Sequence, residues 1–248
     1  MIKKIYANGT DEVNFLKELK KRSGETSKKV EQTVSEIIEN VKENGDKAVK
    51  DYTLKFDGSL PEYYEVPRDV INDALDEAEQ EFVDALLNAM ENIADFHNRQ
   101  REQGFINPKE NGVILGQRIR GLERVGLYVP GGTAAYPSSV LMNAIPAKIA
   151  GVKEIIMVTP PCKDGTPNKD ILVAAAICGV DRVFLSGGAQ AIAALAYGTE
   201  SIPKVDKIVG PGNIYVATAK KLLYGVVDID MIAGPSEILV LADETANP

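Results

Sequence analysis

The chain has 248 residues, and its 36 acidic side chains outnumber 28 Lys and Arg, which gives a net charge of −8 at pH 7. The basic face that binds nucleic acid is therefore not expected. No apolar stretch reaches the ~18 residues that a membrane helix needs, and the charged segment Met1–Val13 is unlike a signal peptide. These features, with two cysteines that form no Cys-x-x-Cys pair, predict a cytoplasmic globular protein without nucleic-acid or membrane partners.

The composition changes near Arg120. Residues 1–120 hold 24 of the 36 acids and 7 of the 21 glycines, whereas residues 121–248 hold the other 12 acids and 14 glycines. Dense charge with little glycine is typical of solvated helices, and glycines between apolar runs are typical of a sheet with tight loops. The chain is therefore predicted to have at least two structural regions.

The first region has apolar residues at helical spacing. They predict a helix that stops at Gly45, a shorter helix over Asp46–Phe56 closed by Asp57-Gly58, and a long helical stretch from Val70 to Phe96. The opposite face of that stretch is acidic, as expected of a solvated helix face. The first region is therefore a helical N-terminal region.

The second region alternates strands and helices, which predicts parallel strands with helical crossovers and helices on both faces, an α/β fold. Before it, Gly112–Ile119 and Glu123–Val129 are predicted to form a hairpin. The predicted strands are Val125–Val129, Glu154–Thr159, Arg182–Leu185, Lys207–Val209, Val226–Ile229 and Glu237–Leu241. The predicted helices are Ser138–Ala150, Asp170–Cys178, Ala189–Tyr197 and Ile214–Leu223.

Four glycine-containing loops follow these strands, at the edge where parallel sheets bind ligands. Glycine lets backbone amides approach a ligand closely, and a helix N-terminus favours an anion. Four such loops favour a ligand cleft over plain turn chemistry, with a phosphate compound as the first candidate. The loops are Val129-Pro-Gly-Gly-Thr133, Ser186-Gly-Gly-Ala-Gln190, Gly210-Pro-Gly-Asn213 and Ala233-Gly-Pro-Ser-Glu237.

The usual nucleotide fingerprints are absent from the sequence. No Gly-x-Gly-x-x-Gly follows a predicted strand, and no P-loop lysine pattern exists. The strand Glu154–Thr159 ends in Thr-Pro-Pro, without the acid that usually binds an adenosine ribose. A nicotinamide cofactor would therefore bind through less usual contacts.

Side chains suited to catalysis are scarce. His97 is the single histidine, and on an acidic helix it is expected to pack or cap. Cys178 lies on an apolar helix, whereas Cys162 in a loop and Ser236 after Gly-Pro have no histidine nearby to act as a base. The residues alone thus predict ligand binding without an evident reaction, and no zinc site.

Four motifs of the sequence are long and specific. They are Gly126-Leu-Tyr-Val-Pro-Gly-Gly132, Gly187-Gly-Ala-Gln-Ala-Ile-Ala-Ala-Leu-Ala-Tyr-Gly-Thr-Glu200, Pro203-Lys-Val-Asp-Lys-Ile-Val-Gly-Pro-Gly-Asn213, and Ile229-Asp230 followed by Ala233-Gly-Pro-Ser-Glu237. These motifs resemble the histidinol dehydrogenase family, and the resemblance covers essentially the whole chain. The weaker segment Ile93-Ala-Asp-Phe-His97 with Gln100 also fits the helical part of that family.

The resemblance implies a homodimeric, zinc-dependent enzyme that ends histidine biosynthesis. It would oxidise L-histidinol through L-histidinaldehyde to L-histidine with NAD. By motif, Tyr128, Gln190 and Asn213 match NAD-contacting positions, and Ser236 matches a substrate-binding serine.

The resemblance also implies two Rossmann-like domains. Residues 1–23 would form an N-terminal helical segment, and residues 24–127 the helix-rich part of the first Rossmann-like domain, completed by 237–248 and further sequence. Residues 128–236 would form the second, with the glycine loops.

No segment of the sequence up to Pro248 matches the family segments that carry the zinc ligands and the acid–base residues. We therefore assign no catalytic or metal-ligating residue and expect a catalytically incomplete chain. Its helical part is expected to expose an apolar face on Phe82, Leu86, Met90 and Ile93.

Two alternatives remain at this point. One is a non-catalytic NAD-binding module that ends at Pro248. The other is a different NAD-linked aldehyde oxidoreductase, which would need a cysteine nucleophile in the cleft, whereas neither cysteine lies in a glycine loop.

Overall fold

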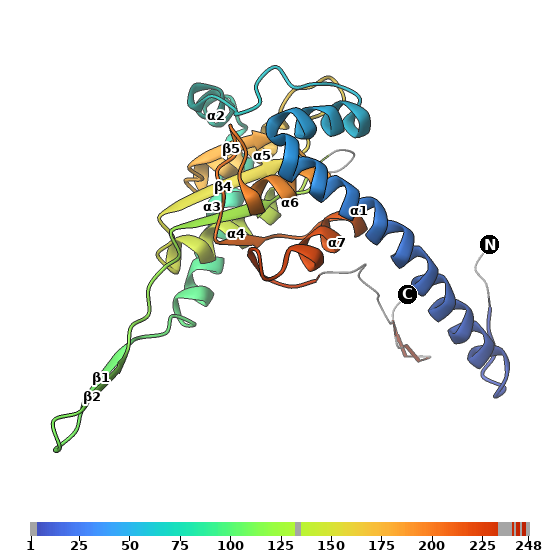
Figure 1. Ribbon diagram of the computed structural model, residues 1–248, viewed down its shortest axis with the longest axis horizontal. Coiled ribbons are helices and arrows are strands. Elements are labelled where there is room, and N and C mark those ends of the chain that lie inside the picture. Colours follow the sequence, from blue (N-terminus) through green and yellow to red (C-terminus); the bar gives the residue numbers. More distant parts are fainter. Residues whose placement is uncertain (1–3, 132–134, 233–239, 241, 244, 247–248) are drawn as a thin grey trace.

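A parallel sheet forms the centre of the fold (Figure 1). The computed structural model describes residues 4–131, 135–232, 240, 242–243 and 245–246, with the backbone alone for 19–27. Within these residues, five parallel strands follow the order β5-β4-β3-β6-β7. They are β3 (Arg124–Tyr128), β4 (Glu154–Thr159), β5 (Arg182–Leu185), β6 (Lys207–Val209) and β7 (Asp228–Ile229).

Helices cover both faces of this sheet. The crossovers α4 and α5 pack with α2 (Arg68–Asp76) and α3 (Gln80–Asn98) on one face, whereas α6 and α7 pack with α1 (Asp11–Asp57) on the other. This doubly wound arrangement confirms the predicted α/β fold, and its strand order reverses between β3 and β6. The crossover helices are α4 (Pro137–Ile149), α5 (Lys169–Ile177), α6 (Gly188–Tyr197) and α7 (Ile214–Leu223).

The strands are buried on both faces, as expected of a covered parallel sheet. In β4, Ile155 and Met157 face the core beneath α4 and α5, while Ile156 and Val158 face the core beneath α6 and α7. Successive side chains of a strand point to opposite faces, so one short apolar run supplies both cores.

The N-terminal helices form outer layers against these crossovers. Helix α1 (Asp11–Asp57) packs on α6 and α7, α2 (Arg68–Asp76) on α5, and α3 (Gln80–Asn98) on α4. The predicted stop at Gly45 is a break inside α1, with φ 52° and ψ −133°. Among the described residues, no helix is long and apolar enough to cross a membrane.

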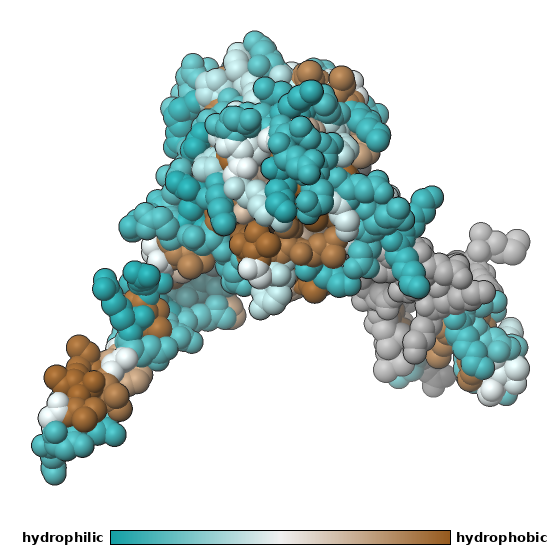
Figure 2. All heavy atoms as spheres, viewed as in Figure 1, coloured by the Kyte–Doolittle hydropathy of each residue, from teal (hydrophilic) through white to brown (hydrophobic). Residues whose placement is uncertain are grey.

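The predicted hairpin was wrong in its pairing. Strand β1 (Phe105–Pro108) pairs antiparallel with β2 (Ile114–Gln117), and this arm projects from the body of the molecule (Figure 1). The segment Glu123–Val129 does not join it because β3 is central in the sheet and bonds to β4 and β6 on its two sides. Figure 2 shows apolar residues gathered on the arm.

The expectation of an exposed apolar face on the helical part was also wrong. Leu86 is 7% exposed, and Phe82, Met90 and Ile93 are partly buried against the same core. Helix α4 supplies their cover. The predicted strand Val226–Ile229 is shortened to β7, and Glu237–Leu241 falls outside the described residues except for Val240.

Replacing Leu86 tests this packing. We expect Leu86→Ala to lower the free energy of unfolding by about 2–4 kcal/mol, because it leaves a cavity between α3 and α4. The adjacent Leu87, which is 39% exposed, is the matched control, and Leu87→Ala should cost about 1 kcal/mol or less. Urea unfolding measures both, and equal losses would contradict the packing of α3 on α4.

Candidate functional site

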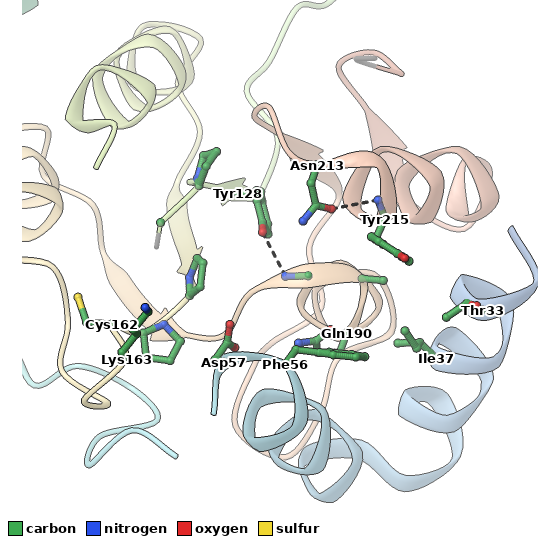
Figure 3. A pocket seen from close by; sticks show the side chains of 16 residues that line it. Thr33, Ile37, Phe56, Asp57, Tyr128, Cys162, Lys163, Gln190, Asn213 and Tyr215 are labelled. Atoms are coloured by element: carbon green, nitrogen blue, oxygen red, sulfur yellow. Dashed lines mark hydrogen bonds between the residues drawn. The ribbon is translucent and has the colours of Figure 1, made fainter. Parts of the chain in front are cut away.

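A cleft of about 860 Å³ opens where the strands end, beside the reversal of strand order between β3 and β6 (Figure 3). Its walls come from α1 and from the segments after β3, β4, β5 and β6. Tyr128, Gln190 and Asn213, which were selected from the sequence, all line it. Its size and position are those of a small-molecule site in a doubly wound fold.

Tyr128 ends β3 and lines the cleft. Its hydroxyl accepts a hydrogen bond from the backbone N–H of Gly188, at 3.1 Å. Burial raises the pKa of Tyr128 to about 12, with a smaller contribution from the charge of Asp57. The phenol is therefore neutral at physiological pH and keeps its own proton to donate.

Gln190 lies in the first turn of α6 and is 1% exposed. Its Oε1 atom is buried and has no hydrogen-bond partner among the described residues. Gly188 permits this placement, because it has φ +65° and a Cβ there would come within 2.6 Å of that oxygen. A buried acceptor without a partner costs about 1–3 kcal/mol, so a ligand donor is its natural partner.

Asn213 caps the N-terminus of α7. Its Oδ1 accepts hydrogen bonds from the backbone N–H groups of Tyr215, at 3.0 Å, and Val216, at 3.1 Å. The amide nitrogen is left on the side of the cleft (Figure 3). One side chain thus stabilises the helix and offers a donor to a ligand.

A buried ion pair fixes the loop that carries Asn213. Lys220 is 1% exposed, donates from Nζ to the carbonyl oxygen of Gly210 at 2.9 Å, and pairs with Asp230. The other carboxylate oxygen of Asp230 accepts from the N–H of Gly210 at 2.8 Å. Gly210 has φ +115°, and a Cβ there would overlap the carbonyl oxygen of Tyr128. The loops after β6 and β7 are thereby held together.

Sequence reasoning missed several cleft and supporting residues. Phe56 and Asp57 of α1 and Lys163 after β4 line the cleft, but they lie far from the glycine loops in the sequence. Lys220 had a local signal, since it shares the apolar spacing of Val216 in α7. A lysine on that face needs a buried anionic partner.

The remaining candidates from the sequence lie in different places. His97 faces another pocket, where its Nδ1 lies 2.7 Å from Oε1 of Gln100. Burial raises the pKa of Cys178 to about 12, which makes it an inert thiol. Cys162 lines the cleft, and Ser236 lies outside the described residues.

No metal centre is found in the part of the chain that the structure describes. There, no group of three or more His, Cys, Asp or Glu side chains is arranged to hold an ion. These residues therefore do not fit a zinc site.

Strand order and cleft together define the class: a doubly wound α/β protein with a ligand-sized cleft at the reversal of its strand order. A family model described as histidinol dehydrogenase matches residues 20–248. The chain therefore belongs to the histidinol dehydrogenase family.

Individual relatives agree with this assignment. The chain is 56% identical to histidinol dehydrogenase of Clostridium acetobutylicum over all 248 residues, which cover 58% of that protein. It is 62% identical to the Streptococcus mutans enzyme over 88% of this chain and 51% of that one. A crystal structure of histidinol dehydrogenase from Elizabethkingia anophelis has a TM-score of 0.80 at 43% identity, covering 87% of this chain and 50% of that chain. The chain thus spans about half the length of its relatives.

Removing one partner of the buried pair tests how the Asn213 loop is held. We expect Lys220→Met to lower the free energy of unfolding by about 2–3 kcal/mol, below the ~3–5 kcal/mol of a fully buried pair because Asp230 is partly exposed. The neighbouring Lys221→Met is the control and should cost less than about 1 kcal/mol, since its 4.0 Å pair with Glu31 is exposed. Denaturant unfolding of both variants measures the two free energies of unfolding. Equal losses would contradict the stabilising role assigned to the pair of Lys220 and Asp230.

Proposed function

We propose that this chain is the cofactor-binding part of an NAD-dependent histidinol dehydrogenase. The enzyme would oxidise L-histidinol through L-histidinaldehyde to L-histidine, the last step of histidine biosynthesis. The observation that carries the proposal is the meeting of Tyr128, Gln190 and Asn213 in one cleft of a chain whose family is histidinol dehydrogenase.

The three residues offer complementary groups to NAD. Gln190 presents a buried acceptor without a partner, which fits a hydroxyl or amide donor of the cofactor. Asn213 leaves its amide nitrogen as a donor, and the Tyr128 hydroxyl keeps a proton to donate after accepting from Gly188. When bound, NAD would supply the acceptor for the hydride that leaves the substrate carbon.

Backbone groups at the cleft favour an anionic ligand. The first turns of α6 and α7 both contribute lining residues, Ala189 in one and Tyr215 in the other. Amides at helix N-termini carry a partial positive charge, and two such ends beside one cleft suit a pyrophosphate. Gly131 and Gly188 also line the cleft, and because glycine has no side chain, the backbone there can come close to a pyrophosphate.

Several further parts of the proposal come from the family resemblance. They are substrate binding by Ser236, zinc held by residues outside those described here, and a domain division into 1–23, 24–127 and 128–236. The proposal includes a cytoplasmic location without nucleic-acid or membrane partners, in keeping with the net charge of −8. It also includes a homodimer, supported by the hairpin arm, where Phe105, Ile106 and Ile114 are 56%, 79% and 69% exposed.

The variant Gln190→Met tests whether Gln190 binds NAD, because it should weaken NAD binding without lowering the stability of the fold. We expect the Kd for NAD to rise about 10-fold, the effect of one lost hydrogen bond. Stability should not fall, because methionine removes a buried acceptor that has no partner. Calorimetric titration with NAD and urea unfolding measure the two effects. Gln117→Met, on the exposed strand β2, is the control, and unchanged NAD affinity in Gln190→Met would contradict the assignment of Gln190.

The substrate is tested by NADH absorbance. We expect the complete enzyme of which this chain is the proposed cofactor-binding part to form NADH when it is mixed with L-histidinol, NAD and zinc. It should form none with L-histidine, because the carbon that bears the hydroxyl group in L-histidinol is already a carboxylate there. NAD binding without NADH formation from L-histidinol would instead support a non-catalytic NAD-binding module.

A further inference from the structure

One acidic side chain of the cleft, Asp57, forms none of the hydrogen bonds that hold Tyr128 and Asn213. Asp57 is the last residue of α1, and its Oδ2 atom is buried without a hydrogen-bond partner in the described structure. Figure 3 shows its carboxylate directed into the cleft, on the side of Lys163 and Gln190. None of the ion pairs found among the described residues involves Asp57.

The position of Asp57 is electrostatically unfavourable for the folded protein. A negative charge at a helix C-terminus meets the negative end of the helix dipole. Burial also raises the pKa of the Asp57 carboxyl above its usual value. The folded state therefore disfavours the ionised form, so the carboxylate lowers stability at neutral pH and this loss diminishes as the pH falls through its pKa. A charge that costs stability in a cleft is a candidate for ligand contact.

The fold indicates which part of a dinucleotide would meet Asp57. In doubly wound sheets the acid that binds the adenosine ribose follows the second strand of the first βαβ unit. Here that strand is β4, which is followed by Pro160 and Pro161 and has no acid at this point. Asp57 lines the same cleft as these prolines but enters from α1. It thus supplies this cleft with the carboxylate that the end of β4 lacks.

We propose that the Asp57 carboxylate accepts hydrogen bonds from the adenosine ribose hydroxyls of the bound dinucleotide and so selects NAD over NADP. This inference rests on the proposed function, because it assumes that NAD occupies the cleft. A ribose with free hydroxyls offers two donors to a carboxylate, which has acceptor capacity for both. The 2′-phosphate of NADP offers no such donors and would place like charges together.

The break in α1 brings Asp57 to this place. At Gly45 the helix changes direction, and the backbone N–H of Asp46 donates to Glu200 at 2.8 Å. Asp46 in turn accepts a hydrogen bond from the hydroxyl of Ser201. These contacts tie the last turns of α1 to the loop after α6, the helix that carries Gln190. The segment that follows α6 therefore helps to position Asp57, and α6 itself carries Gln190, a proposed cofactor contact.

The test compares Asp57→Asn with wild type in calorimetric titrations with NAD and NADP. We expect wild type to bind NAD more tightly than NADP, and the variant to bind NAD roughly 10- to 100-fold more weakly, the effect of losing charge-assisted hydrogen bonds. The preference for NAD should largely disappear. AMP and its 2′-phosphorylated form, titrated in the same way, should show the same change if the ribose is the group recognised.

Urea unfolding distinguishes a structural role for Asp57 from the proposed role in ligand binding. We expect Asp57→Asn to unfold at the same or higher urea concentration than wild type, whereas a structural role would require a loss. Asp51→Asn is the matched control, since Asp51 lies on the same helix, is exposed and is absent from the cleft lining. It should change neither affinity nor stability.

Each other result overturns a defined part of the account. Wild type that binds NAD, with Asp57→Asn binding it equally well, would overturn this inference and leave the proposed function standing. Wild type that prefers NADP, with that preference lost in Lys163→Ala, would assign the ribose region to Lys163 instead. Wild type that binds neither dinucleotide would overturn the proposed function and this inference with it.

Discussion

The contact between Lys220, Asp230 and Gly210 is the interaction on which the site depends most. The lysine neutralises a carboxylate that would otherwise be partly buried without a partner, and the two groups satisfy both backbone polar groups of Gly210. Gly210 begins the loop that ends at Asn213, and Asp230 directly follows β7. The ends of two neighbouring parallel strands are therefore fixed relative to each other. Asn213 at the end of this loop caps α7 and also lines the cleft.

The same cleft joins segments that are distant in the sequence. The central strand β3 supplies Tyr128, helix α6 supplies Gln190, the loop before α7 supplies Asn213, and α1 supplies Asp57 from the first quarter of the chain. The outer layer of helices therefore contributes to the site as well as covering the core. The break at Gly45 makes this possible, because an unbroken helix would carry its last turns elsewhere. The proposed cofactor site thus lies between the end of α1 and the carboxyl edge of the sheet.

Much of this arrangement could be predicted from the sequence, and the exceptions have physical reasons. The bounds of β4, β5 and β6 were predicted correctly, because each is a short apolar run with a proline or glycine within two residues of its end. The hairpin was assigned the wrong partner because β1 is short and contains Asn107 and Pro108, which give little strand signal. Tyr128, Gln190 and Asn213, which line the cleft, were selected through motifs. Asp57 was missed because it enters the cleft from α1, far from the glycine loops in the sequence. Lys220 was missed although its apolar spacing in α7 is a local signal, because its partner Asp230 is set by a tertiary contact.

The central claim is that NAD binds at the carboxyl edge of the sheet, between the end of α1 and the N-termini of α6 and α7. A crystal structure of the protein with NAD tests it most directly. The account predicts electron density for the dinucleotide in this cleft, with Tyr128, Gln190 and Asn213 within hydrogen-bonding distance. NAD bound elsewhere on the protein, with this cleft free of it, would contradict the account.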